Sequence, residues 1–562
     1  MRLRKALGML SKSSPYAVAT ISDDIDAELE IIKRYLYVET DVERAFKEKI
    51  DSITPHEIVF LCGSSGDGKS EILTRYRKEY ESSIEFHLDA THSFKPDATA
   101  VETLDSVFTE FSNSEKPLVV GINVGMLGNY EREGSDAHKL IRTAIKSFLD
   151  HEKQDERYSF IDFESFQKFQ ITDGQVTSEF FSALLDKIVR DDPSNPFREY
   201  LEQTRIAGRD KQIVANFLLL RDSNVQEAII ELLFCARIRK DQFITARMLL
   251  DFIYCLLTTP KYLFDNIFGG GQNELLGAIS DFDPSIIRNK TLDLFVIHRT
   301  LEFEDEQYSD FVAEVDSKFE ISQAHSPQSM IRCIYLLKNT KLTSDYCSKF
   351  ENSFREESLN LYKRMWQLHK DFDGTSETKT KLKNFYNEVV LGSINKYVNR
   401  NAPYLSKDEF YVSSHGGADL TAEVDIYISD PTADTKNIDI SELKLLIKVN
   451  DELLPPVPVN VNLLAMMMDI VNGFRPNKHD KNSVVLLDEL VNKITQHANE
   501  SRVLFLHKDG HRLKLRNNSD GLAFIPTRYC PRDRYPIASG FWQTSPAIPS
   551  VSVTQHHSLD GC

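Results

Sequence analysis

Hydrophobic residues recur with different spacings along this chain. The spacing distinguishes a region in which strands alternate with helices, a helical region and a strand-rich region. Between residues 57 and 175, short apolar runs alternate with segments in which apolar residues return every three or four positions. Four runs predict strands, at 58–62, 84–89, 118–123 and 158–163. Three segments predict helices, at 71–78, 99–111 and 135–151. Strands that alternate with helices imply a parallel sheet with helices on both faces.

The loop after the first of these strands has the glycine spacing of a phosphate cradle. It reads Gly63, Ser64, Ser65, Gly66, Asp67, Gly68, Lys69 and Ser70, and it matches G-x-x-x-x-G-K-[ST] at every required position. Glycines let backbone N–H groups turn toward a phosphate, and the following helix adds a partial positive charge. Lys69 would reach the outer phosphates and the Ser70 hydroxyl would hold Mg²⁺. The sequence therefore predicts a site for ATP and Mg²⁺.

Helical spacing dominates on both sides of this α/β region. Residues 25–53 carry apolar residues at three- and four-residue steps, with Asp41 as the expected N-cap of the second half. From about 176 to 400 the pattern is helical almost throughout, interrupted by a turn at 269–271. No self-similar period is present, so we do not expect a solenoid.

The last third of the chain changes character again. Strands are expected at 410–413, 423–428 and 442–449, a helix at 463–473, and a hairpin over 503–515 that turns at Asp509 and Gly510. From about residue 526 the sequence is rich in Pro, Ser, Thr and Arg without periodicity, which is typical of a disordered or weakly docked tail.

These patterns predict an α/β P-loop NTPase domain, then a large helical region, then a C-terminal α+β or β-rich domain. The expected parts are an N-terminal helical segment, the P-loop core, a helical lid or array, a β-rich domain and an irregular tail, at 1–56, 57–175, 176–400, 401–525 and 526–562.

Composition narrows the class of protein. With 562 residues, 41% hydrophobic and 27% charged, the chain has material for several cores. It has no apolar run of about 18 residues, as a membrane span needs, so we expect a cytoplasmic protein without a membrane anchor. None of the seven cysteines is at C-x-x-C spacing, which argues against a zinc site. A net charge of −18 repels DNA on average, so DNA contact would need a local patch or a basic partner.

Three residues outside the loop are candidates to complete the site. Asp89 follows the second strand and could bind magnesium, although the next residue is Ala90 and not a water-activating Glu; the alternative is a turn or helix cap. Asn123 follows the third strand and could orient the attacking water, or simply form a turn before Gly125. Arg247 would begin a lid helix that contacts the outer phosphates, or would be a solvated surface residue.

Two other patterns suggest different chemistry. Asp488 and Glu489 follow an apolar run, but the apolar positions continue at helical spacing, so we expect a helix there. Asp425 with Glu442 and Lys444 is similar to the metal-binding set of PD-(D/E)xK nucleases, in which carboxylates on adjacent strands hold magnesium.

Three segments together resemble one bacterial family, the DptF (DndF) component of DNA phosphorothioation-dependent restriction systems. They are HEIVFLCGSSGDGKSEIL, FHLDATHSFKPDATAVETLD and LVVGINVGML, at 56–73, 86–105 and 118–127. The resemblance extends from the N-terminal helix to about Ala523. It implies an ATP site in 63–70 and action with DptG and DptH partners, in anti-phage defence, on DNA that lacks phosphorothioate marks. It assigns no role to Asp89, Asn123 or Arg247.

The expected function is therefore an ATPase subunit of a multi-protein restriction complex that reaches DNA through its partners. One alternative is a nucleotide-gated assembly protein with little hydrolysis, because an Asp-Glu pair is absent after the second strand. A second makes the chain the nuclease itself, and a small-molecule kinase is a further option. Formation of a homo-oligomer is left open.

Overall fold

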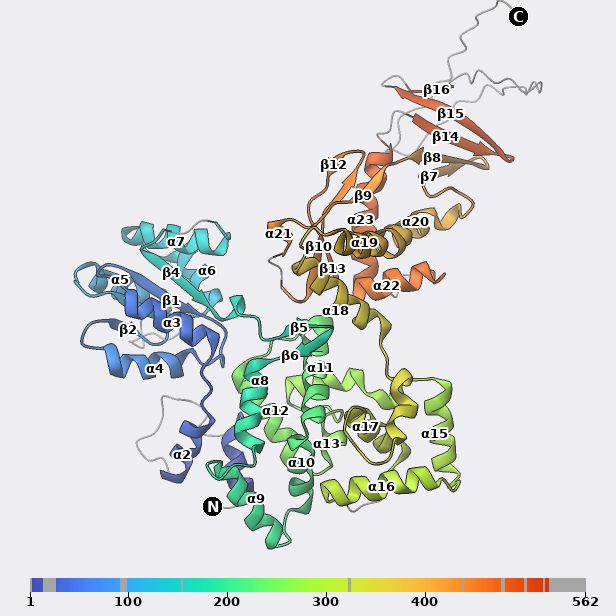
Figure 1. Cartoon of the computed structure of the whole chain (residues 1–562). Coiled ribbons are helices and arrows are strands. Elements are labelled where there is room, and N and C mark those ends of the chain that lie inside the picture. Colours follow the sequence, from blue (N-terminus) through green and yellow to red (C-terminus); the bar gives the residue numbers. More distant parts are fainter. Residues whose placement is uncertain are drawn as a thin grey trace, which may run out of the picture. The chain divides into compact units, whose positions relative to one another are not determined.

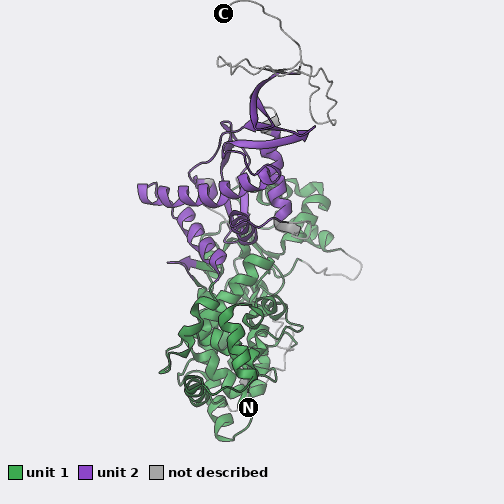
Figure 2. Ribbon diagram, turned by 90° about the vertical axis from the view of Figure 1, so that its right-hand side faces the viewer, with its two compact units in different colours: residues 1–170, 176–355 green, residues 171–175, 356–562 purple. Residues whose placement is uncertain are grey.

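The structure is a computed structural model of the whole chain, and its described residues form two compact units (Figure 2). It describes residues 3–13, 27–90, 99–152, 155–321, 325–436, 439–476, 481–499, 503–518 and 521–524. Unit 1 comprises residues 1–170 and 176–355, and unit 2 comprises residues 171–175 and 356–562. The expected tail at 526–562 and the first two residues of the expected helix at 25–53 lie outside the described residues.

Unit 1 contains a four-stranded parallel sheet in the order β2-β3-β1-β4 (Figure 1). Its strands are β1 (Ile58–Cys62), β2 (Glu85–His87), β3 (Leu118–Ile122) and β4 (Tyr158–Asp162). All five residues of β1 and of β3 are buried, as expected for the central strands of a parallel sheet. The predicted parallel α/β arrangement is confirmed.

Helices pack on both faces of this sheet because alternate residues of β1 point in opposite directions. Ile58, Phe60 and Cys62 join one apolar cluster, with side chains of α5 (Ala100–Ser112), α6 (Val124–Glu133) and α7 (Lys139–Leu149). Val59 and Leu61 join the other, with α3 (Asp41–Ser52) and α4 (Lys69–Tyr80). The sheet is thereby held between two layers of helices.

Two local expectations in this region were wrong or incomplete. The N-cap of α3 is Thr40, whose hydroxyl accepts a hydrogen bond from the Glu43 amide, and Asp41 is already inside the helix. Helix α6 was not expected, because Gly125 and Gly128 lower its helix propensity. It forms where Met126, Leu127 and Tyr130 can be buried against the sheet.

The rest of unit 1 is helical, which confirms the expected helical middle. At its N-terminus are α1 (Leu3–Leu7), a 3-10 turn (Gly8–Leu10) and α2 (Ala27–Leu36). The middle of the chain forms α8 (Glu179–Val189), α9 (Pro196–Ile206), α10 (Lys211–Arg221), α11 (Ser223–Lys240), α12 (Ala246–Thr258), α13 (Leu263–Asn266), α14 (Glu274–Ile279), α15 (Lys290–Thr300), α16 (Glu306–Phe319) and α17 (Pro327–Leu337).

Short elements connect these helices. They include 3-10 turns at Asp136–His138, Phe163–Ser165, Ser280–Phe282, Pro284–Ile286 and Tyr346–Ser353. The strands β5 (Gln170–Thr172) and β6 (Gln175–Thr177) pair with each other.

Unit 2 combines helices with antiparallel strands. Its helices are α18 (Glu357–Lys370), α19 (Ser376–Phe385), a π-helical segment (Tyr386–Leu391), α20 (Gly392–Val398), a 3-10 turn (Asn399–Asn401), α21 (Ala433–Lys436), α22 (Val461–Val471) and α23 (Lys481–Asn499).

Three sheets accompany them. The largest has the order β16-β15-β14-β8-β7 and contains β7 (Glu409–His415), β8 (Ala418–Glu423), β14 (Val503–Lys508), β15 (His511–Asn518) and β16 (Gly521–Phe524). The smaller ones contain β9 (Ile426–Ile428), β11 (Ile447–Val449) and β12 (Glu452–Leu453), and β10 (Glu442–Leu445) with β13 (Val457–Asn460).

The details of unit 2 both confirm and correct the predictions. The hairpin turn at Asp509 and Gly510 is confirmed, with φ of 48° and 78°, and it pairs Lys508 with His511. The expected single strand at 442–449 is instead two strands, β10 and β11, which separate at Leu446 and join different sheets. None of the helices in the described part of the chain is long and apolar enough to cross a bilayer.

Candidate nucleotide-binding site

The glycine loop lies at the carboxyl end of β1, between that strand and α4. Gly66 and Gly68 have φ of 89° and 103°, a left-handed conformation that glycine adopts without strain. Gly63 is required for a different reason, because a Cβ there would lie 2.9 Å from Cδ2 of Phe163. The amide of Gly63 donates to the carbonyl oxygen of Ile122 over 3.2 Å, which ties the start of the loop to β3. Backbone conformation therefore explains Gly66 and Gly68, and the closeness of Phe163 explains Gly63.

Asp67 anchors the loop from inside. It is buried, and its Oδ2 accepts a hydrogen bond of 2.6 Å from the amide of Ser64. Its Oδ1 lies 3.4 Å from Nζ of Lys168, which also donates to the carbonyl oxygen of Ile244 over 2.6 Å. The loop is thus fastened to the segment that leads into α12. Sequence reasoning did not find Lys168, since it lies about a hundred residues from the loop and matches no motif.

Lys69 and Ser70 are the first residues of α4, so both lie at the positive end of a helix. The ammonium group of Lys69 bends over the loop and donates to the carbonyl oxygens of Gly63 at 2.5 Å and Ser64 at 2.7 Å. Burial lowers the pKa of Lys69, while the nearby carboxylates of Asp67 and Asp89 act in the opposite direction. The cation is therefore held at the loop by carbonyl oxygens and acidic neighbours.

A cavity of about 740 Å³ opens over this loop, within the range of ligand sites. Its lining includes the loop residues from Ser65 to Ser70 and three residues predicted as partners, Asp89, Asn123 and Arg247. Asp89 follows β2, and the next amide, that of Ala90, donates to the carbonyl oxygen of Gly121 over 2.9 Å. The carboxyl ends of parallel strands meet at one edge of a sheet, which is where ligands bind in such folds. Residues distant in sequence therefore share one cavity.

Asn123 has a structural role as well as a place in the cavity. It is the N-cap of α6, and its Oδ1 accepts a hydrogen bond of 2.6 Å from the amide of Met126. The sequence alternative, a turn-forming Asn, is close to this arrangement. The cap uses the side-chain oxygen as an acceptor, and the same side chain carries an NH₂ group that can donate.

Arg247 lies against the loop and is half-buried. Its backbone amide donates to the carbonyl oxygen of Gly66 over 3.2 Å, and its Cβ is 3.1 Å from where a Cβ of residue 66 would be. Thr245 caps α12 by accepting a hydrogen bond from the Met248 amide. Arg247 is thus partly exposed and lines the cavity.

Part of the cavity lining is apolar, although Lys33, Thr40 and Glu43 also line it, and the sequence patterns did not identify this part. Its wall comes from the N-terminal segment, α8 and α12, and includes Met9, Leu10, Leu36, Tyr37, Val38, Phe180, Leu184 and Leu250. Glu43 is the buried acid of this wall, and the Tyr37 hydroxyl donates to its carboxylate. The Arg75 guanidinium lies over the Tyr37 ring at 3.5 Å. Burial and Glu43 both raise the pKa of the Tyr37 hydroxyl, so this hydroxyl stays protonated and neutral.

Asp162 places another carboxylate near the loop, at the end of β4. It pairs in register with Cys62 of β1, and its side chain accepts a hydrogen bond of 3.1 Å from the Glu164 amide. Burial raises the pKa of Asp162, and the carboxylate of Asp67 adds to that effect. Asp162 is not among the residues that line the cavity. We therefore assign it a structural role behind the cavity lining.

The donor set fits Mg²⁺ bound together with a nucleotide. Within the described residues no group of three or more His, Cys, Asp or Glu side chains is arranged to hold a metal ion. Magnesium usually binds one or two protein oxygens plus phosphates and waters, not an all-protein cage. The Ser70 hydroxyl and the Asp89 carboxylate, both at the cavity, are oxygen ligands of the kind it prefers.

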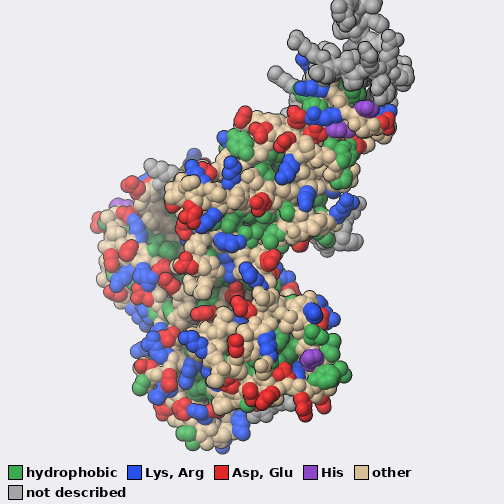
Figure 3. Space-filling model, turned by 45° about the vertical axis from the view of Figure 1, so that its right-hand side comes forward, with side chains coloured by type: hydrophobic (Ala, Val, Ile, Leu, Met, Phe, Trp, Pro, Cys, Tyr) green, Lys and Arg blue, Asp and Glu red, His purple; other side chains and the backbone are tan. Residues whose placement is uncertain are grey.

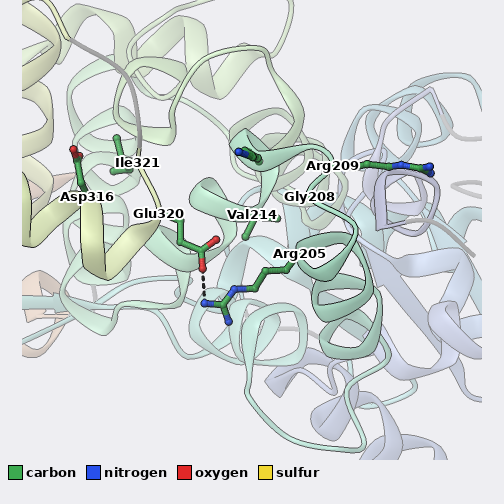
Figure 4. A pocket seen from close by; sticks show the side chains of 8 residues that line it. Arg205, Gly208, Arg209, Val214, Asp316, Glu320 and Ile321 are labelled. Carbon is green, nitrogen blue, oxygen red and sulfur yellow. Dashed lines mark ion pairs between the residues drawn. The ribbon is translucent and has the colours of Figure 1, made fainter.

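A second, smaller cavity in unit 1 has a different character. It measures about 250 Å³, and Figure 4 shows Arg205 and Glu320 pointing toward each other as an ion pair beside it. Its lining mixes Arg209 and Lys211 with Asp316, and it contains no glycine loop of the phosphate-binding type. We do not assign it a ligand.

The residues of the nuclease alternative are separated by the fold. Asp425 immediately precedes β9, whereas Glu442 begins β10, and the two strands belong to different sheets. Nζ of Lys444 lies 3.6 Å from Oε1 of Glu442, and the two residues form an ion pair on the same strand. The adjacent-strand geometry on which that alternative depends is not present. Asp488 and Glu489, the other suggestive pair, lie in α23 as their spacing indicated.

Compared with known proteins, the chain matches no protein-family model and no curated protein sequence. Its function is therefore inferred from the geometry of the cavity and from the sequence.

Proposed function

We propose that this chain is a P-loop NTPase that binds ATP with Mg²⁺ in the 740 Å³ cavity. The observation that carries the proposal is the shared cavity of Lys69, Ser70, Asp89, Asn123 and Arg247. A glycine loop alone is compatible with an ordinary turn. A glycine loop that opens into a ligand-sized cavity, with a cation and polar groups from three other elements, supports phosphate binding.

Each group has a chemical task that follows from its position. The loop amides and Lys69 would bind the phosphate oxygens and neutralise their charge. Ser70 and Asp89 would hold Mg²⁺, which lowers the energy of the charge that develops during phosphoryl transfer. Asn123 would orient water, and Arg247 would contact the outer phosphates from α12. Because Arg247 also binds Gly66 through its backbone, a change in the loop would reach the helical region directly.

The apolar part of the cavity lining would accept the nucleobase. Aliphatic and aromatic side chains there offer a surface against which a planar ring can stack, and Glu43 and Tyr37 hold part of it in place. Triphosphate and base would thereby contact different parts of one cavity lining.

Binding is better supported than hydrolysis, because of Ala90. Its side chain is fully buried in the apolar cluster beneath β3, so no water-activating carboxylate can come from that position. This favours the second candidate function, a nucleotide-gated assembly protein that releases phosphate slowly. A steady ATPase would need its base from another residue.

The biological setting is proposed from the resemblance of the sequence to DptF proteins. On that basis the chain would act with DptG and DptH partners in a complex that restricts DNA lacking phosphorothioate marks. A net charge of −18 supports a subunit that reaches DNA through its partners. Nucleotide-dependent copurification with DptG and DptH would test this part, and partner binding that is indifferent to ATP would contradict the gating role.

The binding proposal is tested by titrating ATP and Mg²⁺ into the purified chain in a calorimeter. Lys69→Ala should weaken binding by at least about 100-fold, because it removes a charged contact to phosphate. Lys78→Ala is the matched control, since Lys78 is an exposed lysine on the same helix α4. Equal affinity in the wild type and Lys69→Ala would refute the site.

Hydrolysis is tested separately, by phosphate release under saturating ATP. An ATPase should turn over above background and lose that activity in Asp89→Asn while Asp89→Asn still binds ATP. If the chain is a gated assembly protein, the wild type and Asp89→Asn should bind ATP equally well, and both should release phosphate only at the background rate.

A further inference from the structure

Helix α15 of unit 1 has apolar residues on both of its faces. Leu292 and Phe295 are buried, and the Phe295 ring packs edge-on against Phe350 with centroids 5.5 Å apart. A second set, at Leu294, Ile297 and Leu301, follows the three- and four-residue spacing of the opposite face and is exposed. Folding of unit 1 therefore accounts for only one side of this helix.

The exposed set is concentrated to an unusual degree. Six of the sixteen exposed large hydrophobic side chains in the described part of the chain lie between residues 286 and 303. They are 38 to 62% exposed and comprise Ile286, Ile287, Leu294, Ile297, Leu301 and Phe303, which we name the α15 patch. In Figure 3 hydrophobic side chains gather at the lower right of the view, over the part of unit 1 that contains α15. Clusters of this kind mark interaction surfaces, whereas isolated exposed hydrophobics do not.

Phe303 is held in this patch by its own contacts. Its amide donates to the carbonyl oxygen of His298 over 3.0 Å, and its carbonyl oxygen accepts from Nη2 of Arg299 at 2.7 Å. Its ring also lies edge-on to the His298 ring, with centroids 5.4 Å apart. The residue is thus fixed on the surface at the end of α15 by three separate contacts.

The charges at the two ends of the α15 patch have opposite sign. Arg288 and Lys290 are exposed at the N-terminal end, where Arg288 forms an ion pair with Asp293 at 3.3 Å and Lys290 adds a further positive charge. Glu302, Glu304 and Glu306 are exposed where α15 ends and α16 begins. If two such helices pack antiparallel about Ile297, Leu294 of one copy lies opposite the Thr300–Leu301 end of the other. The basic end of one patch then lies near the acidic segment that follows Thr300 in the other copy. Parallel packing would instead bring like charges together at both ends.

We propose that the α15 patch is a self-association surface, through which two copies of this chain pair about a two-fold axis with their α15 helices antiparallel. A two-fold contact uses the same patch on both copies, so opposite charges at the two ends of the α15 patch meet twice. The pairing does not depend on the proposed nucleotide site.

The size of the patch predicts how tightly the copies bind. One helix of 11 residues and the segments beside it cover less than the roughly 800 Å² per partner of a standard interface. We therefore expect a weak dimer, with a dissociation constant on the order of micromolar.

Sedimentation velocity of the full chain, from about 1 to 100 µM, tests the proposal. The wild type should shift from monomer to dimer across this range. Ile297→Glu should weaken dimerisation at least about 30-fold, because it places two carboxylates at the two-fold axis. Ile206→Glu is the matched control: Ile206 is 85% exposed at the end of α9, outside the patch, and its variant should dimerise like the wild type.

Charge reversal supplies a second arm that does not depend on removing apolar surface. Lys290→Glu and Glu304→Lys should each weaken the dimer several-fold, and the chain that carries both should recover wild-type affinity. A monomeric wild type at 100 µM, dimerisation that Ile297→Glu leaves unchanged, or a double reversal no better than either single one would each overturn the proposal.

Discussion

The ammonium group of Lys168 lies 3.4 Å from the buried carboxylate of Asp67 and 2.6 Å from the carbonyl oxygen of Ile244. One side chain therefore connects the glycine loop to the segment that leads into α12. Together with the backbone hydrogen bond from Arg247 to Gly66, it forms a double connection between the loop and the helical region. Both connections end on backbone or buried groups, so movement of either partner must be shared by the other.

Loss of this cation should destabilise unit 1. Lys168→Met leaves the buried Asp67 charge without its ion pair, which we expect to lower the free energy of unfolding by about 1–3 kcal/mol. Asp67→Asn keeps an oxygen for the Ser64 amide and removes the charge, so the double variant should lose less than the sum of the two singles. Thermal unfolding of the four proteins measures the coupling, and strictly additive losses would show that the pair does not act as a unit.

Two glycines should respond oppositely to alanine. At Gly121 a Cβ would lie 2.4 Å from Cδ1 of Leu73 and 2.6 Å from the carbonyl oxygen of Leu88, so Gly121→Ala must displace α4 or β2. We expect a loss of several kcal/mol and poor recovery of folded protein. At Gly128, inside α6, nothing lies within 4 Å of the new atom, so Gly128→Ala should raise stability by up to about 1 kcal/mol. Melting temperatures of the two variants provide the comparison, and a stable Gly121→Ala would contradict the close packing of β3.

Substitution of Asn123 separates capping from any contact with nucleotide. Asn123→Ala removes the cap of α6 and should cost about 1 kcal/mol of stability. Asn123→Ser can still accept the Met126 amide but lacks the side-chain NH₂ group, so its stability should be close to that of the wild type. If Asn123 orients water, phosphate release should fall in both variants. Activity that follows stability alone would assign Asn123 a purely structural role.

Asp162 predicts a dependence of stability on pH. Burial raises the pKa of Asp162 above its ordinary value of 3.8, so the folded state binds the proton more tightly than the unfolded state. The free energy of unfolding therefore falls as the pH rises through the interval between the ordinary and the raised pKa of Asp162. Above the raised pKa the full destabilisation from the buried charge is present. Asp162→Asn keeps the acceptor for the Glu164 amide and should melt at a higher temperature than the wild type at pH 7. That advantage should shrink as the pH falls toward 3.8, and an advantage that is constant with pH would show that charge is not its cause.

Much of the α/β region follows from local sequence pattern. The strands at 58–62 and 118–122 and the helix at 100–112 match their predicted positions closely, because a buried strand or an amphipathic helix is recognisable within about ten residues. The loop 63–70 is equally local, since its glycines, Lys69 and Ser70 are adjacent in sequence. By contrast α6 was not predicted, because Gly125 and Gly128 hide a helix that forms once its apolar side packs on the sheet.

Local sequence pattern was therefore enough to predict the glycine loop, the parallel strands beside it, the helical middle and the hairpin at Asp509 and Gly510. The packed structure was needed to show that Asp89, Asn123 and Arg247 share one cavity with that loop, that Lys168 pairs with Asp67, and that residues 442–449 divide between two sheets. The difference arises from the range over which the responsible interactions act. Backbone propensity and side-chain periodicity act over a few residues, whereas the contacts that complete a site depend on which strand ends and helix termini the packed core brings together.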